Sequence, residues 1–216
     1  MSDWHSIYLK QIEKNGQHEK YIKTKVNQKR KLVKLLIKHS GDGKVIEAGC
    51  GTGIISTHLA RKGLNVLGVD MDSKVLGLAK DLEQKYYGDS CVKFKKQSIF
   101  ELNYKENSFD LCYSVGVLEH FADEEIINSL SQQIKIAKKT VVVIPTKWFK
   151  DSEALHGDDR FLKLSYWREL ISQSGGKVIE EASYSFKGKG FNIFDHIKRM
   201  FKPKAYRIFV ISKKDD

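Results

Sequence analysis

The chain has few of the residues that mark disulfide-stapled or multidomain proteins. It contains three cysteines and two prolines in 216 residues. Cys50, Cys91 and Cys112 form an odd set without metal-ligand spacing, which favours free thiols in a reducing cytoplasm over a disulfide framework. The two prolines, and the lack of any Ser/Gly-rich tract, argue against a flexible linker. We therefore expect a single domain over residues 1–216.

Long apolar runs are missing as well. No stretch approaches the roughly 20 apolar residues that a transmembrane helix requires. The first residues also lack the basic start and apolar centre of a signal peptide. Both absences predict a cytoplasmic protein without a transmembrane segment, and they leave peripheral contact with a membrane surface open.

Positive charge, by contrast, is in excess and unevenly placed. The net charge is +11 and the isoelectric point is about 9.4. Ten Lys or Arg residues lie between Lys10 and Lys38, and six more lie between Lys187 and Lys204. Such concentration favours an anionic acceptor or partner. Solvated helix faces that only keep the protein soluble are the alternative.

The most informative feature is a glycine-rich turn after a short apolar run. Residues 45–53 read VIEAGCGTG, and a second apolar run ends at Asp70. Glycine at alternate positions lets the backbone turn sharply and approach a ligand closely. The helix predicted next favours negative charge at its first turn. A dinucleotide-binding turn would read Gly-x-Gly-x-x-Gly, whereas here Ile54 follows the third glycine directly. Asp70 stands where two ribose hydroxyls could share its carboxylate.

These two motifs, with FDLCYSVGVLEHF at residues 109–121, resemble the class I S-adenosylmethionine (SAM) dependent methyltransferases. The resemblance covers residues 44–143 strongly and the remainder loosely. It implies SAM as cofactor, S-adenosylhomocysteine as product and no metal ion. The implied cofactor-binding residues are Glu47, Gly49, Cys50, Gly51, Gly53, Asp70, Met71, Ser98, Ile99, Phe100, Ser114 and Val115.

Within this set, Glu47 is expected to favour the SAM ammonium, Asp70 the ribose and Met71 the adenine. One position departs from the family. The family usually places Asp after the third strand, where it meets the adenine amino group, and this chain has Ser98. A serine hydroxyl can still accept that hydrogen bond, so the site is retained as an expectation.

His120 is the candidate catalytic base, because its side chain titrates near neutral pH and follows the fourth predicted strand. A structural histidine that shapes the loop is an equal alternative. Methyl transfer can rest on proximity and orientation, so no dedicated base is required. A zinc site made by His120 and His156 is not expected, since no cysteine accompanies them at ligand spacing.

The acceptor pocket is expected to combine aromatic and charged side chains from both ends of the chain. An amino-terminal helix would act as a lid, with Tyr8 or Tyr21 reaching inward. The segment after the fifth strand lines this pocket in the family. The expected set is Tyr8, Tyr21, His120, Trp148, His156, Arg160 and Tyr166, and a surface loop packing its aromatic residues on the core is the alternative.

The alternation of patterns predicts an α/β fold, a Rossmann-like three-layer sandwich. Its seven-stranded sheet would be mostly parallel, with the last strand antiparallel, and residues 1–40 would form a helical cap. We expect the SAM-binding core at 44–145 and an acceptor-side region at 146–216, with an insert at 187–204. Predicted strands lie near 44–48, 65–69, 92–96, 109–113, 140–144, 177–186 and 205–213. Predicted helices lie near 4–14, 18–38, 53–62, 73–86, 123–137 and 165–174, the last capped by Ser165.

The predicted activity is methyl transfer to oxygen or nitrogen of a small molecule, with an anionic one favoured by the positive charge. RNA methylation, of tRNA or rRNA, is the main alternative. Against it, the chain has no separate RNA-binding module and no Asn/Asp-Pro-Pro-Tyr/Phe motif. A non-catalytic SAM-binding protein that acts by interaction is a third class.

Overall fold

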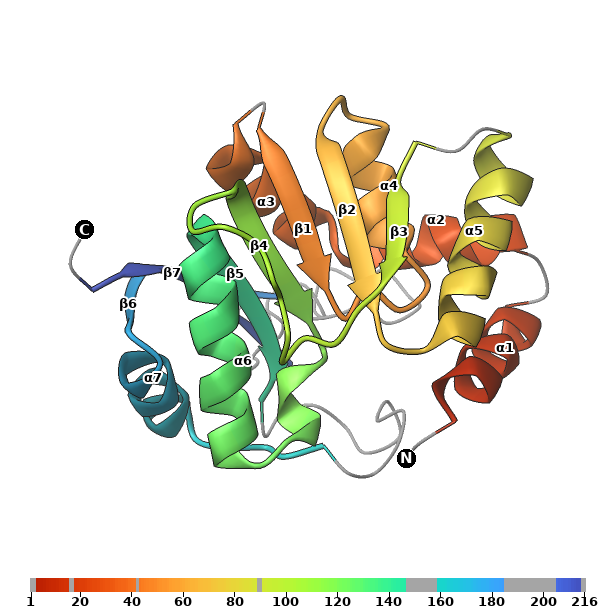
Figure 1. Ribbon diagram of the computed structural model, residues 1–216. Helices are drawn as coiled ribbons and strands as arrows, with labels where there is room; N and C mark the ends of the chain where they lie inside the picture. Colours follow the sequence, from red (N-terminus) through yellow and green to blue (C-terminus); the bar gives the residue numbers. More distant parts are fainter. Residues whose placement is uncertain are drawn as a thin grey trace, which may run out of the picture.

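The computed structural model describes residues 3–15, 18–41, 43–88, 91–146, 159–184 and 205–214. These residues form one seven-stranded sheet with helices on both faces (Figure 1). The helices are α1 (Trp4–Lys14), α2 (His18–Gln28), α3 (Arg30–Ser40), α4 (Ile54–Ala60), α5 (Ser73–Tyr87), α6 (Asp123–Ile136), α7 (Leu164–Gln173) and the 3₁₀ turn η1 (Leu118–His120). The strands are β1 (Lys44–Ala48), β2 (Asn65–Asp70), β3 (Lys93–Lys96), β4 (Phe109–Val115), β5 (Ala137–Pro145), β6 (Gly176–Tyr184) and β7 (Tyr206–Lys213).

The strand order is β3-β2-β1-β4-β5-β7-β6. The first five strands in this order run parallel, and β7 lies antiparallel between β5 and β6. This arrangement confirms the predicted fold class. The order reverses at β1 and β4, and in open α/β sheets ligands bind at such a switch point, beyond the carboxyl ends of the strands.

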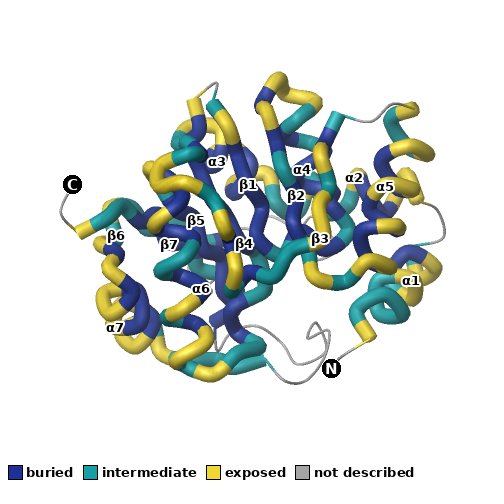
Figure 2. Tube along the Cα trace, viewed as in Figure 1, coloured by how far each residue is buried: buried dark blue, intermediate teal, exposed yellow. Residues whose placement is uncertain are grey.

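Two apolar cores hold the layers together, and strands β1, β4 and β5 lie mostly buried between them (Figure 2). Helices α6 and α7 cover one face of the sheet, with Leu130 and Trp167 fully buried. Helices α3 and α4 cover the other face, with Leu36 and Leu59 fully buried. Each such side chain contributes roughly 1.5–3 kcal/mol through burial, so both helical layers are needed to hold the sheet.

The predicted single helix over residues 18–38 is wrong, because the chain breaks at Lys29. Its backbone angles are φ −101° and ψ 13°, outside the helical region, and they separate α2 from α3. Tyr21 and Ile22 of α2 pack with α1, α4 and α5, whereas Leu32 and Leu36 of α3 pack on the sheet. One straight helix could not direct apolar faces to both places. Only α1 and α2 therefore form the cap, and α3 belongs to the core layer.

The start of α7 also differs from the prediction. Ser165 lies inside the helix, and the capping position is Lys163, whose side chain makes no capping hydrogen bond. The predicted end is confirmed, since Gly175 follows with φ +80°. Among the described helices, none has the length and apolar content to cross a bilayer. The predicted insert at 187–204 lies outside the described residues.

Candidate cofactor and acceptor site

The glycine-rich turn lies at the carboxyl end of β1 and leads into α4. Gly49, Gly51 and Gly53 all have positive φ, between +51° and +73°, a region that favours glycine. The backbone N–H groups of Gly49 and Cys50 both donate to the Val69 carbonyl, at 2.9 Å. The turn is therefore tied to β2, and its geometry requires the three glycines.

Asp70, the last residue of β2, faces this turn. Its carboxylate accepts hydrogen bonds from the Gly51 N–H at 2.9 Å and from the Asp72 N–H at 3.0 Å. Burial raises the pKa of Asp70, and these backbone N–H donors oppose the shift. The helix cap of α5 is Asp72, which accepts from the Lys74 and Val75 N–H groups. Asp70 is thus not needed as that cap.

Glu47 lies beneath the turn and is 4% exposed. The Ser56 hydroxyl donates to its Oε2 at 2.6 Å, and the Tyr113 hydroxyl donates to the same oxygen at 2.9 Å. Burial raises the pKa of Glu47 to about 7, although these two hydrogen bonds and the charge of Lys29 act in the opposite direction. A buried carboxyl that titrates near neutral pH is typical of a functional site.

A cavity of about 430 Å³ opens beside Asp70. This outer cavity has the size of a small-molecule site. Its wall combines the end of β2, the loop after β3 and the loop after β4. The lining residues are Trp4, Tyr8, Gly49, Asp70, Met71, Asp72, Ser98, Ile99, Phe100, Val115, Gly116, Val117, His120, Phe121 and Glu125.

A second cavity, of about 160 Å³, lies deeper. This inner cavity shares Trp4, Tyr8, Gly49, Val115, Gly116 and His120 with the outer one. Its remaining wall comes from the cap, from Glu47 and from the ends of β5, β6 and β7. Those residues are Tyr21, Lys25, Lys29, Glu47, Cys50, Thr52, Ile54, Ile55, Glu119, Pro145, Asp159, Tyr184 and Tyr206. The two cavities form adjacent parts of one site.

The cap helices contribute aromatic residues and lysines to this site. Tyr8 of α1 approaches the turn so closely that a Cβ on Gly51 would lie 2.6 Å from its hydroxyl oxygen. Tyr21 of α2 is 1% exposed, and burial raises its pKa to about 12. Both side chains point inward, in the position expected of a lid.

Lys25 and Lys29 are one helical turn apart and both line the inner cavity. Burial lowers the pKa of Lys25 to about 8, and the charge of Lys29 lowers it further. Burial also lowers the pKa of Lys29, whereas Glu47 and Glu119 act to raise it. The cavity therefore holds positive and negative groups together, an arrangement suited to a ligand that carries both charges.

His120 lies in η1, between the two cavities. The imidazole packs edge-on against Trp4, with ring centroids 5.1 Å apart. Its Nε2 lies 3.9 Å from the Asp159 Oδ1, beyond hydrogen-bond distance. His120 thus lines both cavities, and its role as base stays a prediction.

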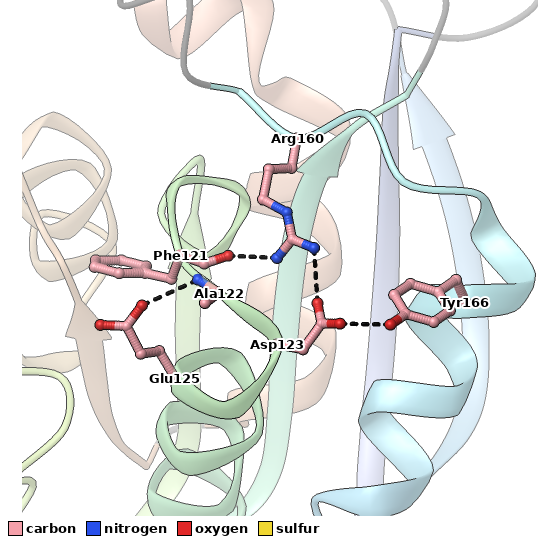
Figure 3. Close-up of polar contacts among 6 residues, drawn as sticks. All are labelled: Phe121, Ala122, Asp123, Glu125, Arg160 and Tyr166. Carbon is pink, nitrogen blue, oxygen red and sulfur yellow. Dashed lines mark hydrogen bonds and ion pairs between the residues drawn. The ribbon is translucent and has the colours of Figure 1, made fainter.

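Arg160 and Tyr166 line neither cavity, which corrects their expected place in the acceptor pocket. The Arg160 guanidinium donates to the Phe121 carbonyl at 2.6 Å and to the Asp123 carboxylate at 2.8 Å (Figure 3). The Tyr166 hydroxyl donates to the other oxygen of Asp123. These bonds join the segment after residue 159 to the start of α6. Arg160 and Tyr166 therefore hold these two segments together.

The other expected residues divide into three groups. Glu47, Gly49, Cys50, Asp70, Met71, Ser98, Ile99, Phe100 and Val115 line one of the two cavities. Gly51 and Gly53 shape the turn, and Ser114 is 1% exposed and lines neither cavity. Trp148 and His156 lie outside the described residues.

Sequence reasoning missed several lining residues, above all Trp4, Lys25, Lys29, Glu119 and Asp159. The two lysines could have been recognised from their spacing in the sequence. They stand four residues apart on the side of the helix that also carries Tyr21 and Ile22, where a lysine is unexpected. Asp159 lies in the segment after the fifth strand, which was expected to line the pocket, but only the fold shows that it lies beside His120.

The chain is similar to known methyltransferases. Residues 46–137 match the family described as "Methyltransferase domain". A putative methyltransferase of Bacillus subtilis (strain 168), YqeM, is 25% identical over 180 residues, which cover 76% of this chain and 70% of that protein. The ubiquinone biosynthesis O-methyltransferase of Colwellia psychrerythraea (strain 34H) is 34% identical over 169 residues, covering 67% of this chain and 65% of that enzyme.

The corresponding enzyme of Rhizobium etli is 35% identical over 83 residues, so the match spans only 33% of its length. Among solved structures, magnesium protoporphyrin IX methyltransferase from Synechocystis PCC 6803 with bound SAM gives a TM-score of 0.64 at 20% identity. That alignment covers 86% of this chain and 77% of the other. At this identity the likeness concerns the fold.

Together, the matched domain, the sheet topology and the glycine turn with Asp70 define the class. Residues 46–137 belong to the methyltransferase domain family, and the sheet has the fold of the class I SAM-dependent methyltransferases. The residues present fit SAM. The glycine turn adds no side chain of its own to the wall, Asp70 lines the outer cavity, and the inner cavity offers both charges that a methionyl group requires.

Proposed function

We propose that this protein transfers a methyl group from SAM to oxygen or nitrogen of a small molecule. The observation that carries the proposal is the junction of the two cavities, where the wall shared by both contains Gly49, Gly116 and His120. SAM supplies an activated methyl group on its sulfonium. The protein's part is to hold cofactor and acceptor in line, which alone can account for much of the rate.

The site residues divide this work. Asp70 would accept the ribose hydroxyls, and Met71, Ile99 and Phe100 would pack around the adenine in the outer cavity. In the inner cavity, Glu47 offers negative charge for the methionyl ammonium, and Lys25 offers positive charge for the carboxylate. An acceptor would approach from the remaining space beside His120.

The enclosed shape of the two cavities favours a small acceptor. Trp4 and Tyr8 of α1 line both cavities, and Tyr184 and Tyr206, stacked with ring centroids 4.9 Å apart, line the inner one. A polymer would need an open groove across this wall. Two of the relatives are named ubiquinone biosynthesis O-methyltransferases, and that name supports the same class. An anionic acceptor would suit the lysines, and this part of the proposal rests on charge alone.

The first test is cofactor binding. Asp70→Ala should weaken SAM binding by about 1.5–3 kcal/mol, the scale for losing hydrogen bonds to a charged acceptor. By calorimetry this would be a loss of about 10- to 150-fold in affinity. Asp81→Ala, an exposed position on α5, is the matched control and should leave affinity unchanged. A folded Asp70→Ala variant with full SAM affinity would contradict the proposed site.

The second test concerns the acceptor class. The protein is incubated with methyl-labelled SAM and, separately, with a pool of small phenols, catechols and carboxylic acids or with total cellular RNA. We expect label in a low-mass product and none in RNA. Label that enters RNA would favour the alternative activity, and stoichiometric SAM binding without label in any fraction would favour a non-catalytic protein.

A further inference from the structure

Three metal-ligating side chains meet at the wall of the inner cavity. One ligand atom from each of Glu119, His120 and Asp159 lies within 4.8 Å of the other two. Glu119 is 3% exposed, and the side chains of His120 and Asp159 are 11% and 9% exposed. These three side chains, called the triad below, are therefore buried, unlike the exposed carboxylate clusters that are common on protein surfaces.

Asp159 provides an independent sign of a missing ligand. Its side chain is more than nine-tenths buried and lines the inner cavity. Within the described part of the chain, no hydrogen-bond partner reaches its Oδ2. A buried carboxylate oxygen without a partner is costly, because it has lost water and gained nothing in return. A cation in the cavity would supply that partner.

The fold holds Asp159 in this position firmly. The backbone N–H of the next residue, Arg160, donates to the Glu119 carbonyl at 2.9 Å. The Arg160 guanidinium then bonds to Phe121 and Asp123, on the far side of η1 (Figure 3). These contacts bind the segment at 159 to the turn that carries Glu119 and His120. Asp159 is thus placed beside the pair by the clamp that Arg160 forms.

The donor set and its dimensions fit a divalent cation. Two carboxylates and one imidazole suit ions that accept oxygen and nitrogen together, such as Mn²⁺ or Zn²⁺. In an octahedral site with bonds of about 2.1 Å, adjacent ligands lie about 3 Å apart and opposite ligands about 4.2 Å apart, whereas the three ligand atoms here lie within 4.8 Å of one another. The triad would need to contract by less than the length of one bond. The charge of the cavity wall also fits a cation, because the wall has three carboxyl groups and two lysines. These are Glu47, Glu119 and Asp159, and Lys25 and Lys29.

We propose that Glu119, His120 and Asp159 bind a divalent cation that orients an oxygen of the methyl acceptor. This inference rests on the proposed function, because it places the ion beside the acceptor space. A cation there would supply Lewis acidity and help the acceptor hydroxyl to ionise. That hydroxyl gives its proton to solvent, its oxygen pair forms the bond to the methyl carbon, and the C–S bonding pair returns to sulfur. The acceptor class is then a small molecule with a hydroxyl, preferably beside a second oxygen.

The experiment measures the ion directly. Full-length protein is treated with chelator, dialysed, and titrated with Mn²⁺ while free Mn²⁺ is followed by electron paramagnetic resonance. We expect one Mn²⁺ per chain. Asp159→Asn should weaken this binding by about tenfold or more, as loss of a ligating carboxylate does. The matched control, Asp81→Asn on the exposed side of α5, should bind as the unchanged protein does.

SAM binding by calorimetry, in chelated protein, separates this inference from the proposed function. SAM binding with no saturable Mn²⁺ binding up to about 10 mM, well above the weakest protein sites, would overturn the cation site and leave the methyltransferase proposal intact. It would make Lys29 the counter-ion of Glu119. Equal Mn²⁺ affinity in Asp159→Asn would overturn the site as well. If that variant fails to fold, the absorption spectrum of bound Co²⁺ in the unchanged protein decides, since it reports nitrogen and oxygen ligation.

Discussion

At the scale of single residues, the buried Glu47 carboxyl lowers the stability of the fold while it provides a charged group for the site. Its carboxyl is buried beneath the glycine turn, accepts two hydroxyl hydrogen bonds, and has a pKa raised to about 7. In the unfolded chain it would titrate near 4.5. Between these two values the folded state binds more protons than the unfolded state, so this group lowers stability as the pH rises through that window.

Glu47→Gln should remove that loss while keeping an oxygen for Ser56 and Tyr113. Without SAM, we expect the variant to exceed the unchanged protein in unfolding free energy at pH 8 by on the order of 1–3 kcal/mol, and the difference to vanish near pH 4.5. SAM affinity should fall, because the negative charge for the ammonium is lost. Urea unfolding at several pH values, with calorimetry for SAM, tests both. A stability difference that does not change with pH would contradict the assignment.

At the scale of elements, the strand–turn–helix unit of β1 and α4 depends on glycine. Gly51 has φ +51°, and a Cβ there would lie 2.6 Å from the Tyr8 hydroxyl oxygen. Gly51→Val adds a branched side chain, which tolerates positive φ badly and displaces α1. We expect SAM binding to be lost beyond detection, with a lower melting temperature. Gly63→Val is the control. It also has positive φ but no atom near its Cβ position, so it should lower stability without abolishing SAM binding.

The lid can be tested through α1 alone. This helix packs on α2 and α5, whereas α3 supplies fully buried residues to the sheet core. Removal of residues 1–15 takes away Trp4 and Tyr8 and should abolish turnover, yet the sheet should still fold. Circular dichroism and a melting curve check the fold, and labelled methyl transfer checks activity. Full turnover in the truncated protein would show that α1 is not part of the site.

At the scale of the whole molecule, the net charge of +11 bears on the acceptor class. Several basic side chains of the amino-terminal stretch are already engaged within the protein. Lys31 donates to the Ser183 carbonyl, Lys38 pairs with Glu180, and Lys25 and Lys29 line the inner cavity. Fewer cations are therefore available to an external polyanion than the sequence suggests.

We accordingly expect weak binding to total cellular RNA with a shallow dependence on salt. Each phosphate neutralised by a protein cation would add about 0.7–0.9 to the slope of log affinity against log salt. A filter-binding series between low and physiological salt measures this slope. Tight binding with a slope that indicates several phosphates, together with methyl label in the RNA, would overturn the small-molecule proposal.

Much of this molecule could be predicted because the decisive signals are local. Strand β1 has the predicted bounds, β2 to β5 lie within a few residues of theirs, and all three glycines of the turn adopt positive φ. A buried parallel strand needs a continuous apolar run, and a sharp strand–helix turn needs glycine. Both features can therefore be recognised from short stretches of the sequence. The prediction of one helix over residues 18–38 failed because the same apolar pattern fits one long helix or two helices that pack against different parts of the fold.

The sequence by itself determined the class of methyltransferase fold and its cofactor, and it predicted that the glycine turn and Asp70 form the core of the cofactor site. The glycine turn and Asp70 lie on adjacent strands, and chain connectivity brings them together in any such fold. Only the tertiary structure decided that Arg160 is a clamp, that Lys25 and Lys29 face a cavity, and that Asp159 joins Glu119 and His120. Those contacts join segments far apart in the chain. Their geometry depends on how whole helices and loops pack, which no local pattern of residues records.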